Sequence, residues 1–169
     1  NQIDPGHAEV HFRLGQCYFN LEKKELASQA FATARDLDVL RFRADSQINS
    51  IIRELGGNSA SGESKNVELV DGAQILAESA YAAQGLPGDA LLYDHVHLSF
   101  LGNYLVARGL AERVIFETGP VRGELPTAEE TARLLAFTPW DRYGLTDNLN
   151  KGLLSRPPFT YQLGHARRQ

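Results

Sequence analysis

The residues from Asp94 to Gly102 read Asp-His-Val-His-Leu-Ser-Phe-Leu-Gly, and they are the part of the chain best suited to chemistry. Asp94 stands three residues before His97, so its carboxylate can accept a hydrogen bond from one ring nitrogen of that histidine. Such a bond fixes the tautomer of the ring and leaves the other nitrogen available as a general base. An acid and a base in this arrangement are two of the three groups of a nucleophilic triad, whose third group is an activated serine.

The serine that would complete a triad is not recognisable in the 169 residues of the chain. The chain begins at Asn1 without a methionine and contains no methionine at all, so we expect it to be a piece of a longer protein. If that protein is catalytic, we expect its nucleophile to lie on the N-terminal side of Asn1. The fragment alone is then expected to be inactive.

Two other interpretations of these residues remain open. Asp94 and His97 can serve structure alone, by holding the turn that leads into the following helix. With His95 they also form Asp-His-x-His, whose alternating residues on an extended segment could share a metal ion. No second cluster of ligands accompanies them, and His7 and His11 lack the Glu directly after the first histidine that marks a zinc-binding helix. We therefore expect no metal and no cofactor.

The composition describes an ordinary globular chain, with 43% hydrophobic and 22% charged residues. A net charge of −4 gives no general reason to expect nucleic acid or an anionic membrane as a partner. No apolar run approaches the length of a membrane span. The single cysteine, Cys17, excludes an internal disulfide and a cysteine-based zinc site, and its place on an apolar helix face predicts that it is buried.

Hydrophobic periodicity predicts the elements that would position the Asp-His pair. A helix follows the pair directly, with Ser99 as its N-cap, and short extended segments precede it at 66–70 and 90–93. The later helix near 127–136 has Thr127 as a candidate cap. The predicted helices span residues 8–21, 25–37, 40–55, 73–80, 100–117, 127–136 and 139–154.

The first helical pair carries apolar and small residues in the order of a tetratricopeptide repeat. The segment 8–41 therefore resembles one such repeat, although His11 stands where the family usually has Trp and Val39 where it often has Pro. The resemblance implies a helical hairpin that presents a surface to a protein partner; a plain hairpin without a partner is the alternative. Since one repeat cannot bury its own apolar face, we expect the 40–55 helix to cap it and further repeats to lie upstream. The matching residues are Leu14-Gly15, Tyr18, Ala27, Phe31 and Ala34.

The next part of the chain runs in the order helix, strand ending in Val-Asp, short helix, loop, Asp-x-x-His, long helix. It resembles the C-terminal half of the SGNH (GDSL-type) hydrolases, which fold as a flavodoxin-like three-layer α/β/α sandwich. The resemblance implies ester hydrolysis or acyl transfer, with His97 as the base and Asp94 as the residue that orients it. Phe100 and Asn103 are then expected to line the rim of the substrate pocket. The matching blocks are 48–55, 67–71 and 92–103.

The chain also departs from the SGNH pattern. Leu98-Ser99 stands where the family often has Pro-Asn, and the family's opening Gly-Asp-Ser block is absent, as are the Gly and Asn blocks that complete the oxyanion hole. Gly57-Asn58-Ser59 is no substitute, because it follows a predicted helix in a polar turn rather than a buried strand. The α/β layer of this fragment is therefore expected to be incomplete.

These observations predict an α/β chain that is predominantly helical. We expect a tetratricopeptide-like hairpin with a capping helix over 1–56, an SGNH-like C-terminal half over 57–120 and a helical appendix over 121–169. The appendix resembles segments that follow an SGNH-like Asp-x-x-His block in multi-domain bacterial tetratricopeptide proteins. The leading hypothesis is a portion of a hydrolase that acts on a small-molecule ester. The alternative is a non-catalytic scaffold that binds a protein through the hairpin.

Overall fold

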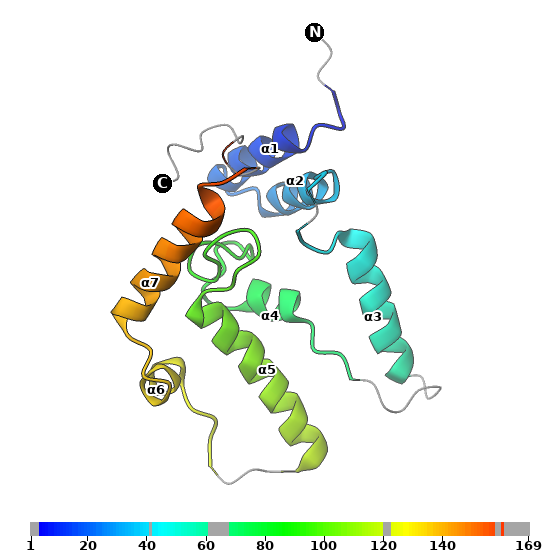
Figure 1. Cartoon of the computed structure of the whole chain (residues 1–169). Helices are drawn as coiled ribbons and strands as arrows, with labels where there is room; N and C mark the ends of the chain where they lie inside the picture. Colours follow the sequence, from blue (N-terminus) through cyan, green and yellow to red (C-terminus); the bar gives the residue numbers. More distant parts are fainter. Residues whose placement is uncertain (1–3, 41, 61–67, 120–122, 158–159, 161–169) are drawn as a thin grey trace. The chain divides into compact units, whose positions relative to one another are not determined.

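The computed structural model describes residues 4–40, 42–60, 68–119, 123–157 and 160, and in residues 57–60 the backbone alone. These residues form α-helices and one π-helical segment, and they contain no β-strand (Figure 1). Contacts divide the chain into two compact units, 1–120 and 121–169. The elements are α1 (Ala8–Asn20), α2 (Lys24–Asp36), α3 (Ser46–Ala60), α4 (Gly72–Glu78), α5 (Phe100–Thr118), α6 (Ala128–Leu134), α7 (Pro139–Leu149) and η1 (Asn150–Leu154).

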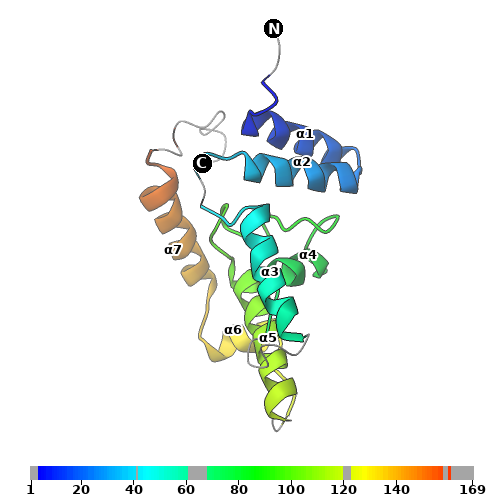
Figure 2. The same ribbon diagram turned by 90° about the vertical axis from the view of Figure 1, so that its right-hand side faces the viewer.

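The helices α1 and α2 form the predicted hairpin, and they lie side by side in Figures 1 and 2. Gly15 is buried at their contact, and a Cβ there would lie 2.6 Å from the ring of Phe31. The rings of Phe12 and Phe31 are 5.6 Å apart, which extends this contact along α1. Small residues therefore let the two helices approach closely. The buried residues of α2 are Ala27, Ala30 and Ala34.

The helix α3 begins six residues later than the predicted 40–55 helix, so the predicted start was wrong. Asp45 sets the observed start, because its carboxylate accepts the backbone N–H of Ile48 at 2.9 Å and it is itself buried. The helix also continues to Ala60, through the glycines where a turn was predicted. Gly56 is a packing position instead: a Cβ there would meet the Leu69 side chain at 2.5 Å.

The predicted α/β layer is not formed within the described residues. Of the predicted strand 66–70, residues 66 and 67 lie outside the described part of the chain, and Glu68–Val70 has no regular secondary structure. In the predicted extended segment 90–93, Leu92 forms a single antiparallel bridge with Leu98. A strand requires a neighbour for its backbone N–H and C=O groups, and the described residues supply none.

The helix α5 is anchored at its N-terminal end and along its middle. Its observed range agrees with the predicted 100–117 helix to within one residue. The short helix α4 packs against it, because a Cβ at Gly109 would lie 2.5 Å from Ile75 and one at Gly72 would lie 3.6 Å from Val106. This contact holds the loop between α4 and α5, which carries the Asp-His pair, to the rest of the first unit.

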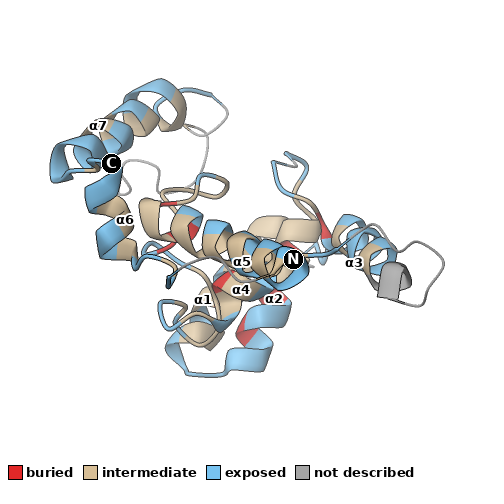
Figure 3. Ribbon diagram, turned by 90° about the horizontal axis from the view of Figure 1, so that it is seen from below, coloured by how far each residue is buried: buried red, intermediate tan, exposed pale blue. Residues whose placement is uncertain are grey.

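Few residues of the described chain are buried (Figure 3). Cys17 is exposed, so its predicted burial was wrong. It stands two residues after the buried Gly15, about 200° further around α1, and so faces away from the contact with α2. The fully or nearly buried apolar residues are Ala27, Ala30, Ala34, Leu76 and Leu91.

The second unit, 121–169, contains α6 and α7, and both helices begin with a capping box. Thr127 accepts the backbone N–H of Glu130, as predicted, and Thr138 accepts that of Asp141. The helix α7 ends at Leu149, and the chain continues as the π-helical segment η1. In the part of the chain that the structure describes, no helix combines the length and the apolar character needed to cross a bilayer.

The close approach at Gly15 generates a stability prediction. We expect Gly15→Ala to lower the free energy of unfolding by about 1–3 kcal/mol, because the added methyl group forces the Phe31 ring to move. Gly144→Ala on α7 is the matched control: nothing lies within 4 Å of its Cβ position, and alanine should raise stability there by about 0.5–1 kcal/mol. Urea unfolding followed by circular dichroism measures both. Equal stabilisation by the two substitutions would contradict the close packing of α1 on α2.

Candidate functional site

Asp94 and His97 are joined by the predicted hydrogen bond. The Nδ1 atom of His97 lies 2.7 Å from Oδ2 of Asp94. The other carboxylate oxygen, Oδ1, accepts the backbone N–H groups of Val96 and His97, each at 2.7 Å. With Nδ1 facing a carboxylate, the proton of a neutral imidazole resides on Nδ1, and Nε2 carries the basic lone pair.

The two members of the pair differ in their exposure. The side chain of Asp94 is 4% exposed, whereas that of His97 is 47% exposed. Burial alone would raise the pKa of Asp94. The hydrogen bonds from the backbone of His97 and Val96 and from the His97 ring outweigh burial and hold this pKa below its usual value. A buried carboxylate that stays ionised next to an accessible imidazole is the arrangement needed to orient a general base.

The loop that carries the pair is closed at its base by backbone hydrogen bonds. The N–H of Tyr93 donates to the carbonyl of His97 at 2.8 Å, and the N–H of Ser99 donates to the carbonyl of Leu91 at 2.9 Å. These two bonds bring the segments before and after the Asp-His pair together. His97 therefore has its ring fixed by Asp94 and its backbone fixed by Tyr93.

Ser99 joins this loop to α5. Its hydroxyl accepts the backbone N–H of Gly102 at 3.1 Å, as predicted for an N-cap, and donates to the carbonyl of Ala90 at 2.8 Å. Gly102 is needed because a Cβ at that position would overlap the carbonyl oxygen of Leu91. Both bonds of the Ser99 hydroxyl are thus used for structure, and this serine is not directed at the His97 ring.

Asn103 and Phe100 occupy the first turn of α5. The side-chain amide of Asn103 donates to the carbonyls of Leu98 and Ser99, both at 3.1 Å, and so holds the same turn. Phe100 is half-buried as the first residue of the helix. In the sequence, Phe100 and Asn103 follow His97 by three and six positions. Their role at the rim of a substrate pocket stays a prediction.

The connection between α2 and α3 reaches the same loop, which the sequence did not predict. The rings of Phe42 and His95 meet edge to face, with centroids 5.1 Å apart. Burial lowers the pKa of His95, and the negative charge of Asp94 opposes this effect without cancelling it. Because Phe42 and His95 are far apart in the sequence, no local pattern could have indicated this contact.

The other candidate ligands do not gather into a metal centre within the described part of the chain. No group of three His, Cys, Asp or Glu side chains has the geometry to hold an ion there. His11 places its Nε2 atom 2.8 Å from the carbonyl oxygen of Pro5, so its ring closes the start of the hairpin.

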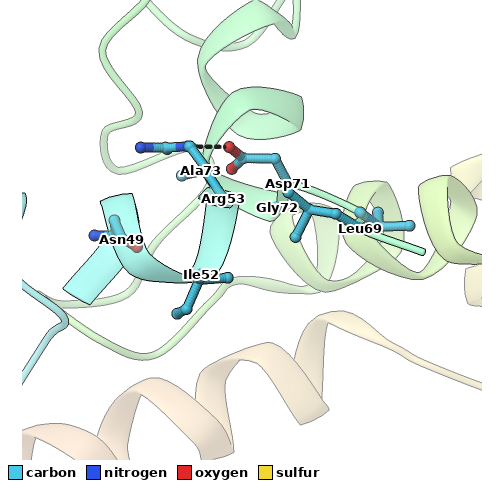
Figure 4. Close-up of a pocket in the computed structure, with 8 residues that line it drawn as sticks. Asn49, Ile52, Arg53, Leu69, Asp71, Gly72 and Ala73 are labelled. Carbon is cyan, nitrogen blue, oxygen red and sulfur yellow. Dashed lines mark hydrogen bonds and ion pairs between the residues drawn. The ribbon is translucent and has the colours of Figure 1, made fainter. Parts of the chain in front are cut away.

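A separate cleft lies between α3 and the segment that leads into α4, with a volume of about 140 Å³ (Figure 4). Arg53 reaches across from α3 to Asp71 at 2.6 Å, and its hydrogen bond lowers the pKa of Asp71. Asp94 and His97 are not among the lining residues, so this cleft is not centred on the pair. The lining residues are Asn49, Ile52, Arg53, Leu69, Val70, Asp71, Gly72 and Ala73.

The Asp94–His97 pair has the geometry of a general base, but within the described residues no nucleophile is hydrogen-bonded to it. There, the ring of His97 is hydrogen-bonded to Asp94 through Nδ1, and no serine hydroxyl is bonded to Nε2. An oriented imidazole of this kind can accept a proton from a hydroxyl group that is brought to it.

No protein-family model, no curated protein and no solved structure matches this chain. The assignment of function therefore depends on the residues and on their geometry.

The lowered pKa of Asp94 generates a pH-dependent prediction. A carboxylate with a pKa lower in the folded than in the unfolded state contributes stability above the unfolded value, and loses it as the pH falls through the folded value. At neutral pH, Asp94→Asn should lower the free energy of unfolding by about 1–3 kcal/mol, because the bonds to a charged acceptor are weakened. Below the lowered pKa that Asp94 has in the folded state, wild type and variant should be equally stable.

Urea unfolding at the two pH values measures this difference. Asp89→Asn is the matched control, since Asp89 is exposed, and it should leave stability unchanged at both pH values. A difference between Asp94→Asn and wild type that is as large in acid as at neutral pH would rule out the charged hydrogen bonds as its cause.

Proposed function

We propose that this chain supplies the base, His97, and the residue that orients it, Asp94, to an SGNH-type hydrolase that acts on an ester or transfers an acyl group. The observation that carries the proposal is the bond between Asp94 and the Nδ1 atom of His97, in a loop whose carboxylate is buried and whose imidazole is accessible. A buried carboxylate bonded to Nδ1 and an accessible imidazole are both required of a base in a nucleophilic triad.

In this mechanism Nε2 of His97 removes the proton from a serine hydroxyl as that oxygen attacks the carbonyl carbon of the ester. The serine oxygen forms a bond to carbon, and the imidazolium then returns the proton to the departing alcohol as the carbon–oxygen bond breaks. Asp94 stays ionised and stabilises the imidazolium. In this proposal the serine and the oxyanion hole are supplied by a segment upstream of Asn1.

We also propose that the SGNH-like part completes a three-layer α/β/α unit in the intact protein. Leu69 lies against α3 at Gly56, whereas the next residue, Val70, has its Cγ1 atom 3.7 Å from a Cβ position at Gly109 of α5. Two successive side chains of this segment thus contact two different helices. Contacts with two helices support a strand that lies between helical layers.

A second candidate, a non-catalytic scaffold that binds a protein, is favoured by the helical hairpin. The contact of Gly15 with Phe31 supports the close helix packing of a tetratricopeptide repeat. Several large side chains of the hairpin remain exposed, among them those of Leu14 and Leu26. In this case Asp94 and His97 serve only to hold the turn into α5.

Turnover of a short-chain p-nitrophenyl ester by the intact protein tests the hydrolase. His97→Ala should lower the rate by on the order of 10⁴–10⁶, and Asp94→Asn by on the order of 10⁴, because the imidazole then loses its correct tautomer. His7→Ala is the matched control, since His7 is exposed and makes no capping bond, and it should leave the rate unchanged.

Circular dichroism shows whether each variant retains its helices. The hydrolase is excluded if the folded His97→Ala protein turns over the ester as fast as the wild type, or if neither has any turnover. Either result favours the scaffold, because the Asp94–His97 bond would then have a structural role alone.

A further inference from the structure

The loop that carries the Asp-His pair is supported from outside at its tip. The bond from the N–H of Tyr93 to the carbonyl of His97 encloses three residues, and His95 is the central one. The ring of His95 meets the ring of Phe42 edge to face, with centroids 5.1 Å apart. This arrangement is attractive, because the positive edge of one ring faces the negative face of the other. The tip of the loop is therefore in contact with the connection between α2 and α3.

The connection that presents Phe42 is held on both sides of this residue. Before it, the carboxylate of Asp38 accepts the N–H of Leu40 at 2.9 Å, and the N–H of Phe42 donates to the carbonyl of Leu40 at 2.9 Å. After it, the side-chain amide of Asn49 in the first turn of α3 donates to the carbonyl of Ala44 at 3.1 Å. An aromatic ring on a backbone that is held in this way can restrain a loop that it touches.

The charge state of His95 suits a packing role next to the pair. Burial lowers the pKa of His95 by more than the negative charge of Asp94 raises it, so the ring is uncharged at neutral pH. An uncharged ring packs on Phe42 without the cost of burying a charge. It also places no second positive charge next to the imidazolium that His97 forms in the proposed mechanism.

The position of His95 is linked to that of the pair through the backbone. All three hydrogen bonds to the carboxylate of Asp94 come from Val96 and His97, and His95 stands between Asp94 and these donors in the sequence. A displacement of His95 would therefore move Asp94 relative to the groups that it bonds. Misplacement of a catalytic group by about 1 Å can cost on the order of 10²-fold in rate, so the restraint of this tip matters to a general base.

We propose that Phe42 is a positioning residue for His97 and acts through the ring of His95. By packing on His95 it restrains the tip of the loop and so favours the bond between Asp94 and the Nδ1 atom of His97. Phe42 lies outside the blocks 48–55, 67–71 and 92–103 that resemble an SGNH hydrolase, so the segment that follows the hairpin contributes to the site. The effect on catalysis rests on the proposed hydrolase, whereas the restraint of the loop does not.

Nitrogen-15 magnetic resonance of the chain tests the restraint without any substrate. The bond to Asp94 selects the tautomer of the neutral His97 ring with its proton on Nδ1. Phe42→Ala should lower the ratio of this tautomer to the other by about three- to tenfold, the equivalent of one aromatic contact. Phe42 is 50% exposed, so the fold should persist, which circular dichroism checks. Phe116→Ala is the matched control, because Phe116 is exposed near the C-terminal end of α5, and the ratio should not change.

Ester turnover by the intact protein tests the effect on catalysis. Phe42→Ala should lower kcat by about three- to tenfold and leave KM unchanged, since in this proposal Phe42 orients the base and does not bind the ester. Phe42→Tyr keeps the ring and should retain both the tautomer ratio and kcat. An unchanged ratio in the folded Phe42→Ala protein, or an equal change in Phe116→Ala, would overturn the proposal.

The two measurements separate this proposal from the proposed hydrolase. A lowered tautomer ratio together with an unchanged kcat would overturn the catalytic role of Phe42 while the hydrolase stood. A lowered ratio in a protein whose wild type has no ester turnover would exclude the hydrolase, and the restraint of His97 by Phe42 would still be established.

Discussion

The carboxylate of Asp94 is the group around which the candidate site is organised. A buried carboxylate is stable only when its oxygens accept hydrogen bonds, and here all three donors come from Val96 and His97. The loop must therefore wrap closely around Asp94. The position of the His97 imidazole follows directly from this requirement. The same bonds serve a structural turn and a catalytic base, so the two functions share one geometry and differ in what reaches Nε2.

The second constraint is the start of α5, which determines where the loop ends. The Ser99 hydroxyl bonds both the first turn of the helix and the carbonyl of Ala90, and Gly102 lets the helix approach Leu91 without a clash. Since Leu91 is among the few buried residues of the chain, this contact links the site to the core. The start of α5 and the loop that carries the Asp-His pair are thus stabilised by the same small set of atoms.

Local signals in the sequence predicted most of the helices and the geometry of the pair. The caps Ser99 and Thr127 and the Asp94–His97 bond each involve residues within a few positions of one another, where spacing alone decides the contact. Long-range features were missed. The buried Asp45 that starts α3 and the exposure of Cys17 depend on which helix faces are covered. The strand predicted at 66–70 was not found in the described residues for the same reason. Whether a segment forms a strand depends on a second segment that pairs with its backbone, and the local sequence does not specify that second segment.

The Nε2 atom of His97 could act as a base only if a hydroxyl group were brought to it. The bond between Asp94 and Nδ1 already fixes the ring, so the imidazole would not have to be oriented again for such a group. The structural arrangement therefore removes one entropic cost of general-base catalysis, whereas the supply of the hydroxyl group depends on residues other than this pair.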